Sequence, residues 1–337
     1  MTTRRPVLVM GASGFLGSHV TRQLVERGDR VRVLLRRSSS TRPIDDLDVE
    51  RHYGDIFDDD AVRAAMAGCE AVFYCVVDTR AWLRDPAPLF RTNVEGLRRV
   101  LDIATAAELK RFVFTSTIGA VAVGRNGRAA CEDDSFNWPG VGGPYIESRR
   151  QAEQLVLEYT RERGLPAVAM CVSNTYGPRD WQPTPHGAMV AAAALGKVPV
   201  HISGVASEVV GVEDAARALV LAADRGRIGE RYIISERYLS QREIFAAAAR
   251  AVGVRPPRIG VPLAAVYAAG YVGSLAGRLL DRDFPVTVTS VRLLDTTSPL
   301  DHSKATKDLG WQPEPATDAI ARAARFYVER HQKRAAA

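Results

Sequence analysis

Apolar runs and amphipathic stretches alternate along the first half of the chain. The apolar runs are continuous rather than alternating with polar residues, which is typical of strands buried on both faces of a parallel sheet. The stretches between them carry apolar residues at helical spacing. Strands are predicted over 6–10, 31–35, 71–77, 111–117 and 167–173. The pattern therefore predicts an α/β fold, a doubly wound parallel sheet with helices on both faces.

The pattern changes after about residue 175. Proline and glycine become frequent, and helical stretches dominate, including 213–225 and 240–252. We therefore expect a sheet domain over 1–175 and a smaller, partly helical substrate-side lobe over 176–330, with its elements interleaved with the sheet. The last residues, 331–337, are expected to fray.

Composition narrows the class of protein. The chain of 337 residues is 46% hydrophobic and 25% charged, as is usual for globular proteins. Its net charge is +6, but the arginines are spread along the chain, so no nucleic-acid partner is expected. The four cysteines have no metal-ligand spacing, which predicts no metal site and reduced thiols in a cytoplasmic protein without an export signal. The most apolar segment, 261–280, is expected to be a buried or groove-lining helix, and no membrane partner is expected.

A glycine-rich loop follows the first predicted strand. In "VLVMGASGFLGSHV", Gly11, Gly14 and Gly17 stand at G-x-x-G-x-x-G spacing between a strand and a helix. Glycines allow a tight turn and close approach to a pyrophosphate, and the helix N-terminus offers free N–H groups. The remaining residues expected to contact the dinucleotide there are Ser13, Phe15 and Leu16.

The end of the second strand bears on which dinucleotide binds. NAD-binding sheets usually place an acidic residue there for the ribose hydroxyls, whereas this chain has Leu35 followed by Arg36 and Arg37. Arginine without a competing carboxylate suits a 2′-phosphate, so NADP is favoured over NAD. Asp55 and Ile56 in "YGDIFD" follow a further strand, between 31–35 and 71–77, and are expected beside the adenine.

These segments together resemble the extended short-chain dehydrogenases/reductases, which include NAD-dependent epimerases/dehydratases, dihydroflavonol reductases and 3β-hydroxysteroid dehydrogenases. "GASGFLG" is similar to the family's nucleotide loop, "TNVEGLRRVLDIA" to its central helix, "RFVFTST" to its catalytic-hydroxyl strand and "YIESRRQAE" to its tyrosine helix. The resemblance implies a Rossmann-type fold, a nicotinamide cofactor and a homodimer through helices at 86–107 and 145–163. It also implies site roles: cofactor contacts from Cys75, Asn93 and Ser116, a carbonyl-polarising hydroxyl on Thr117, and the acid/base on Tyr145.

The chain departs from the family at the position four residues after the tyrosine. The family's lysine is replaced by Arg149, which keeps the positive charge but does not readily release a proton. We expect Arg149 to hold the cofactor ribose and to act in catalysis with Thr117 and Tyr145. An alternative cation is Arg150, although it points about 100° away on a helix.

The substrate is less well defined by the sequence. The expected substrate contacts are Asp78, Trp82, Thr117, Asn174, Trp181 and His186. The aromatic residues among them, together with the apolar 261–280 segment, favour a hydrophobic ketone, aldehyde or secondary alcohol as the substrate. Two alternatives stay open: an epimerase or dehydratase that retains NAD and acts on a nucleotide sugar, and a non-catalytic NADP-binding regulator.

Overall fold

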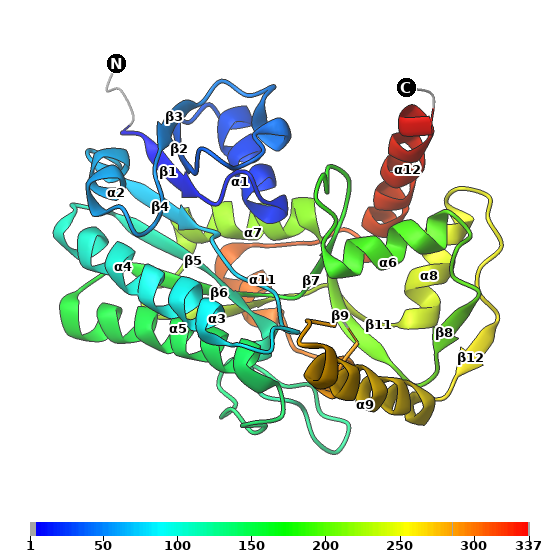
Figure 1. The fold of residues 1–337 in the computed structure, drawn as a ribbon. Coiled ribbons are helices and arrows are strands. Elements are labelled where there is room, and N and C mark those ends of the chain that lie inside the picture. The colour runs from blue at the N-terminus through cyan, green and yellow to red at the C-terminus, as the bar shows by residue number, and fades with distance from the viewer. Residues whose placement is uncertain (1–4, 285, 336–337) are drawn as a thin grey trace.

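Seven parallel strands form the central sheet in the computed structural model, which describes residues 5–284 and 286–335 (Figure 1). In spatial order the strands are β10 (Arg231–Ile234), β6 (Ala167–Val172), β5 (Arg111–Thr117), β4 (Ala71–Tyr74), β1 (Val7–Met10), β2 (Val31–Leu35) and β3 (Glu50–Tyr53). From β1 the chain proceeds outward in one direction through β2 and β3, and β4 then starts the other half. Ligands of such sheets bind where this reversal occurs, beyond the carboxyl ends of the strands.

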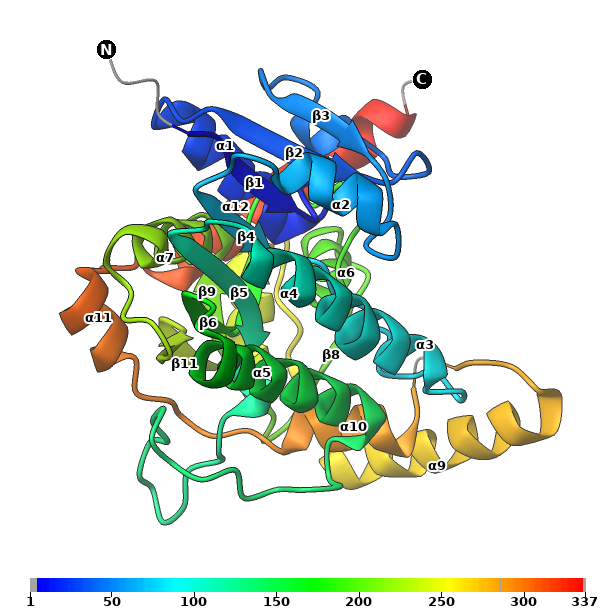
Figure 2. The same ribbon diagram turned by 90° about the vertical axis from the view of Figure 1, so that its left-hand side faces the viewer.

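Helices cover both faces of this sheet, as the sequence pattern predicted. One face packs against α1 (Phe15–Glu26), α7 (Val212–Arg225) and α11 (Ser303–Leu309). The other packs against α2 (Asp59–Met66), α4 (Leu97–Ala106) and α5 (Gly143–Arg163). Both views show α4 and α5 side by side (Figures 1 and 2). Successive strand residues alternate between the two cores, with Val7 and Val9 in one and Leu8 and Met10 in the other.

The second half builds a smaller lobe and also returns to the central sheet. The lobe's strands are β7 (Asn174–Tyr176), β9 (Ala206–Gly211) and β11 (Arg237–Ser240) in one sheet and β8 (Val200–Ile202) and β12 (Ile259–Val261) in another. Its helices α6 (Pro185–Ala194), α8 (Gln241–Arg250) and α12 (Ala316–Ala335) share a separate apolar core. Strand β10 pairs with β6 at the edge of the central sheet, so the two halves of the chain are interleaved.

Three expected elements differ in the structure. The strand expected over 71–77 ends at Tyr74, and the chain then turns along the carboxyl edge of the sheet. The helix expected over 86–107 comprises α3 (Ala87–Phe90), a π-helical turn η2 (Arg91–Gly96) and α4. The tail expected to fray over 331–337 is helical over residues 331–335, because α12 continues to Ala335, and residues 336–337 lie outside the described part of the chain.

The apolar segment expected to be buried forms an exposed helix instead. Within the described residues, α9 (Leu263–Leu280) is the one helix long and apolar enough to cross a membrane by length and composition, and only 11% of it is buried. Helix α10 (Val288–Asp295) packs beside it. The expectation of burial is therefore wrong. The expectation that this segment lines a groove holds for Val266, which borders the large cavity described next.

Candidate active site

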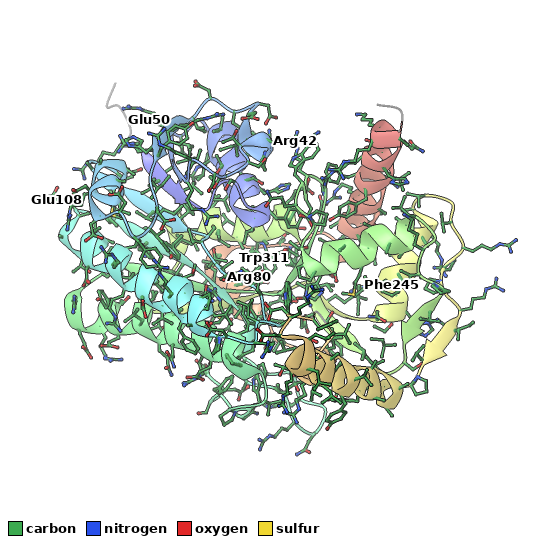
Figure 3. The ribbon with its side chains drawn as sticks, viewed as in Figure 1. Arg42, Glu50, Arg80, Glu108, Phe245 and Trp311 are labelled. Atoms are coloured by element: carbon green, nitrogen blue, oxygen red, sulfur yellow. The ribbon has the colours of Figure 1, made fainter. Side chains whose placement is uncertain are left out.

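A cavity of about 1930 Å³ extends from the carboxyl edge of the central sheet into the smaller lobe. Single ligand pockets usually measure roughly 300–1,000 Å³, so this cavity has room for a dinucleotide and a second molecule. Two of its lining residues are labelled in Figure 3: Arg80, which follows β4, and Phe245, which lies on α8 in the lobe. The two halves of the chain therefore both contribute to one site.

The glycine loop shapes the cavity floor as the spacing predicted. Gly11 has a φ of +85°, and a Cβ there would lie 2.8 Å from the backbone of Cys75. A Cβ on Gly17 would lie 2.2 Å from the Gly11 carbonyl oxygen, so only glycine lets α1 start this close to the loop. Gly14 precedes α1 without a side-chain cap, which leaves first-turn N–H groups available to an anion. The loop residues lining the cavity are Gly11, Ser13, Gly14, Phe15, Leu16 and Gly17.

The two arginines after β2 occupy different environments. Arg36 is exposed, lines the cavity and forms no ion pair with any described residue. Arg37 does not line the cavity, and its guanidinium lies 5.5 Å from the centre of the Tyr53 ring. Asp55 lines the cavity beside Ile56, and one of its carboxylate oxygens accepts from the Phe57 N–H. Arg36 is therefore better placed than Arg37 to contact a phosphate group on a bound adenosine.

The expected catalytic side chains lie together at the carboxyl end of β5. Thr117 ends that strand, and its Oγ1 accepts from the Gly119 N–H at 3.1 Å, at the start of the 3₁₀ turn η3 (Ile118–Ala120). The hydroxyl proton of Thr117 therefore stays available to donate. Tyr145 lies in the first turn of α5 and Arg149 one turn later. All three side chains and Ser116 line the cavity, as does Cys75 at the end of β4.

The surroundings of Tyr145 favour its protonated form. Burial raises the pKa of its phenol, the nearby Arg149 cation opposes this rise, and Asp78 adds to it. A protonated phenol at neutral pH is the state that donates a proton.

Arg149 is a buried cation that no carboxylate pairs with within the described residues. Its side chain is 2% exposed, and burial lowers the pKa of its guanidinium. One nitrogen, Nη2, donates to the Thr115 carbonyl at 2.5 Å, and the group lies 5.5 Å from the Phe114 ring centre. Its Nε has no partner among the described atoms. Because buried donors are normally satisfied, this arrangement indicates a polar group that a ligand supplies.

Arg150 is not the active-site cation. It pairs with Glu147 at 2.9 Å on the same helix and does not line the cavity. The structure therefore contradicts that alternative, for the reason given by helix geometry.

Asn93 lies behind the cavity wall rather than in it. It is 2% exposed; its Oδ1 accepts from the Asp78 N–H, and its Nδ2 donates to the Asp78 carbonyl and to the Ser148 hydroxyl. The expectation that Asn93 contacts the cofactor is corrected: Asn93 ties the segment after β4 to α5. The carboxylate of Asp78 does line the cavity and pairs with Arg80 at 2.5 Å.

The expected substrate contacts divide between the cavity and the surface. Trp82, Asn174 and His186 line the cavity. Trp181 does not, because its indole packs 3.9 Å from the guanidinium of Arg42 and edge-on against Phe326. Burial lowers the pKa of His186 to about 4, so this imidazole is neutral at neutral pH.

Several lining residues carry no sequence motif. Gln182, Glu208 and Gln241 reach the cavity from separate elements of the second half. Glu208 accepts hydrogen bonds from the Ser235 hydroxyl and the Leu300 N–H, and burial raises the pKa of its carboxyl group. Only the three-dimensional arrangement brings these positions together. No local spacing in the sequence could have identified them.

Comparison with known proteins assigns the chain to a family. Residues 7–235 match the NAD dependent epimerase/dehydratase family. The chain is 30% identical to the sterol demethylase protein B of Methylococcus capsulatus, over 96% of this chain and 98% of that protein. It is 27% identical to a 4-hydroxy-2-methyl-3-oxo-4-farnesyl-3,4-dihydroquinoline-1-oxide ketoreductase of Stigmatella aurantiaca, over 90% of each. The crystal structure of gox2253 superposes with a TM-score of 0.86 at 33% identity, covering 97% of this chain and 99% of that one.

A parallel sheet with a glycine loop at its switch point and a Thr–Tyr pair beside it defines a nicotinamide-dependent enzyme of the extended short-chain dehydrogenase/reductase class. The chain belongs to the NAD dependent epimerase/dehydratase family within that class.

Proposed function

We propose that this enzyme is an NADP-dependent oxidoreductase that reduces a hydrophobic ketone or aldehyde, or oxidises a secondary alcohol. The observation that carries the proposal is the charge of the cavity wall in the second half of the chain. Among the described lining residues from Val172 to Leu300 there is no lysine or arginine, and the one carboxylate is Glu208. A nucleotide sugar carries a second pyrophosphate, which needs cationic groups at this end of the site.

The apolar side chains there support an uncharged substrate. Those that reach the cavity from the smaller lobe and from α9 and α10 include Met189, Ile202, Val205, Ile244, Phe245, Val266, Val291, Leu293 and Leu294. Neutral polar groups such as His186 and Gln241 are interspersed with them. A few polar groups on an apolar wall are the usual means of orienting a hydrophobic ligand.

The chemistry follows from three side chains. A bound nicotinamide cofactor would supply or accept the hydride. Thr117 donates a hydrogen bond to the carbonyl oxygen of the substrate and polarises it. Tyr145 gives its phenolic proton to the same oxygen as negative charge develops there. The Arg149 cation then stabilises the resulting phenolate until the phenol regains a proton from solvent, because arginine does not serve as the proton donor.

The residues present fit an adenine dinucleotide. The uncapped start of α1 and the glycine loop would hold the pyrophosphate, and Asp55 would accept from the adenine amino group. Arg149 would hold a ribose hydroxyl near the nicotinamide. Arg36, exposed and without an ion pair in the described part of the chain, would bind the 2′-phosphate of NADP.

The first experiment is a titration of the purified protein with NADPH and with NADH, after a check for co-purified nucleotide. Tight, reversible NADPH binding and much weaker NADH binding are expected. A panel of hydrophobic ketones and aldehydes then follows, with Tyr145→Phe as the inactive control. Retained NAD, or turnover of a nucleotide sugar without net oxidation, would establish the epimerase or dehydratase alternative instead.

We also propose a cytoplasmic homodimer. All four cysteines are unpaired within the described residues, which suits a reducing compartment. Helices α4 and α5 lie side by side on one face of the sheet and would form the dimer contact. Likewise, residues 1–175 would serve as the cofactor domain and 176–330 as the substrate lobe.

A further inference from the structure

Helix α9 presents a continuous apolar face to solvent. Tyr271, Leu275 and Leu279 are spaced four residues apart, so they lie on one face of the helix, with Val272 beside them. These four side chains are between 58% and 76% exposed. Both views place α9 at the periphery of the molecule (Figures 1 and 2). Large exposed apolar faces of this kind are binding surfaces for a protein or a membrane.

The opposite face of α9 is already occupied by protein. A Cβ on Gly270 would lie 3.2 Å from the Thr287 backbone, and one on Gly273 would lie 2.0 Å from the Val286 carbonyl oxygen. The chain leading into α10 therefore packs closely against this face. The helix is consequently fixed by its glycine face, with the tyrosine–leucine face turned outward.

Arginines without an ion pair among the described residues flank α9. Residues 252–280 contain three arginines and no acidic residue. Arg255 and Arg258 precede the helix, Arg278 lies in its last turn, and Arg282 follows it; all four are exposed, and none forms an ion pair within the described part of the chain. Three carboxylates lie nearby. Those of Asp281 and Asp283 accept from Arg84, and that of Asp295 accepts from the Tyr267 hydroxyl of α9.

We propose that α9 docks on an anionic lipid surface. Its Tyr271–Leu279 face would enter the interfacial layer, and the flanking arginines would meet the headgroups, as in helices that lie in the plane of a membrane. At 18 residues and with one face packed on the protein, α9 lies on the surface rather than across the bilayer. A second copy of this chain is the rival occupant. A symmetric contact would bring the same arginines toward one another, so the charge favours the lipid.

The docking face and the cavity lie on two sides of the same helix pair. Val266 on α9 and Val291, Leu293 and Leu294 on α10 line the cavity. A hydrophobic substrate dissolved in the bilayer would thus have a short route into the site. This consequence depends on the proposed function, but the docking itself does not.

Vesicle sedimentation of the full chain tests the proposal. Vesicles of phosphatidylcholine alone are compared with vesicles that also contain phosphatidylglycerol, at low and high salt. The bound fraction is expected to be about fivefold or more higher on the anionic vesicles and to fall with salt. Leu275→Glu with Leu279→Glu, and separately Arg278→Glu with Arg282→Glu, should each abolish most of this binding.

Two single-site control variants make the same kinds of change elsewhere on the surface. Ile228→Glu alters another exposed apolar side chain, and Arg30→Glu another exposed arginine without an ion pair in the described chain. Both should bind vesicles like the unmodified protein, and thermal unfolding should show that all variants are folded. Equal loss in the controls, or no binding to anionic vesicles, would overturn the proposal. So would a dimer that Leu275→Glu with Leu279→Glu dissociates in the absence of vesicle binding, a result that would assign the face to a second copy.

Discussion

The guanidinium of Arg149 donates a hydrogen bond to the backbone carbonyl of Thr115 at 2.5 Å. Thr115 lies two residues before Thr117 on β5, whereas Arg149 lies one turn after Tyr145 on α5. This single contact therefore joins the strand that carries the hydroxyl to the helix that carries the phenol. Arginine has five N–H donors, so it can hold this carbonyl and still offer donors to a ligand.

Two replacements of Arg149 test separately what its charge and its shape contribute to catalysis. Arg149→Lys keeps a cation, and ketone reduction is expected to stay within about tenfold of the unmodified rate. Arg149→Met removes the cation beside Tyr145, and a loss of about 100-fold or more in kcat is expected. Steady-state kinetics with NADPH and a ketone substrate provide the measurement, with thermal unfolding as the check on folding. If neither the unmodified protein nor Arg149→Lys reduces any ketone tested, the catalytic role is wrong.

The protonation state of Tyr145 predicts opposite pH profiles for the two directions. Burial raises its pKa above the ordinary value, so the phenol is protonated throughout the neutral range. Reduction uses the protonated form, so its rate should stay constant with pH through the neutral range and fall only where the pH approaches the raised pKa of Tyr145. Oxidation uses the phenolate and should rise with pH over the same range. A reduction rate that declined between pH 6 and 8 would place a different group in the role of the acid. Tyr145→Phe should remove both profiles while leaving cofactor binding intact.

The two arginines after β2 form a matched pair for testing cofactor choice. Arg36 lines the cavity, whereas Arg37 packs against Tyr53 outside it. Arg36→Ala is expected to weaken NADPH binding by about 10- to 100-fold with little change for NADH, because one charge-assisted contact to the 2′-phosphate is lost. Arg37→Ala should change NADPH binding by less than about threefold. Isothermal titration of both cofactors distinguishes the two, and equal effects in the two variants would contradict the Arg36 assignment.

Two glycines of the loop should respond differently to an added methyl group. Gly17→Ala would place a Cβ 2.2 Å from the Gly11 carbonyl, so α1 must shift, and a loss of stability of about 1–3 kcal/mol is expected. Gly14→Ala meets only the same oxygen at 3.3 Å, and its backbone is extended, so the fold should be nearly unaffected. Its methyl group would instead crowd a bound pyrophosphate. Urea unfolding and NADPH titration should thus show lost stability for Gly17→Ala and lost cofactor affinity alone for Gly14→Ala.

The sequence predicted the first half of the molecule better than the second, for a physical reason. The buried parallel strands over 31–35 and 111–117 are rich in apolar residues, and the structure has both with the same bounds. The short strands of the smaller lobe, such as β8 and β12, have three residues each and carry too little pattern to be recognised. The segment at 261–280 misled for a related reason: apolar composition predicts burial, but it does not say whether the covering surface belongs to the same chain.

The site residues also divide into those that the sequence predicted correctly and those that it did not. Residues within motifs, such as Thr117, Tyr145 and Gly11, line the cavity because a local pattern fixes their place at strand ends and helix starts. The sequence predicts Trp181 as a substrate contact, but in the structure its aromatic ring packs against Arg42 instead. Which way a loop side chain points depends on long-range packing, and the sequence alone does not contain that information in a local form.

Glu153 is a buried network position that helical spacing could have indicated. It lies four residues after Arg149 and eight after Tyr145, on the buried side of α5. Its carboxylate accepts from the Ser116 hydroxyl, from the Cys171 thiol at 3.2 Å and from Arg231 at 2.8 Å. Burial raises the pKa of that thiol, which keeps it protonated as a donor. The network links β5, β6 and β10 directly beneath the catalytic groups.

Glu153→Gln tests how much the fold depends on this buried carboxylate. The change leaves the mostly buried Arg231 without its charge partner, and a loss of about 3–5 kcal/mol in the free energy of unfolding is expected. Glu230→Gln provides the control, because it breaks the Lys304 ion pair at a side chain that is 40% exposed and should cost less than about 1 kcal/mol. Urea unfolding at neutral pH measures both. Equal stabilities for the two variants would mean that Arg231 is satisfied by its bonds to the carbonyls of Ala120 and Glu132, and that the charge of Glu153 is dispensable for the fold.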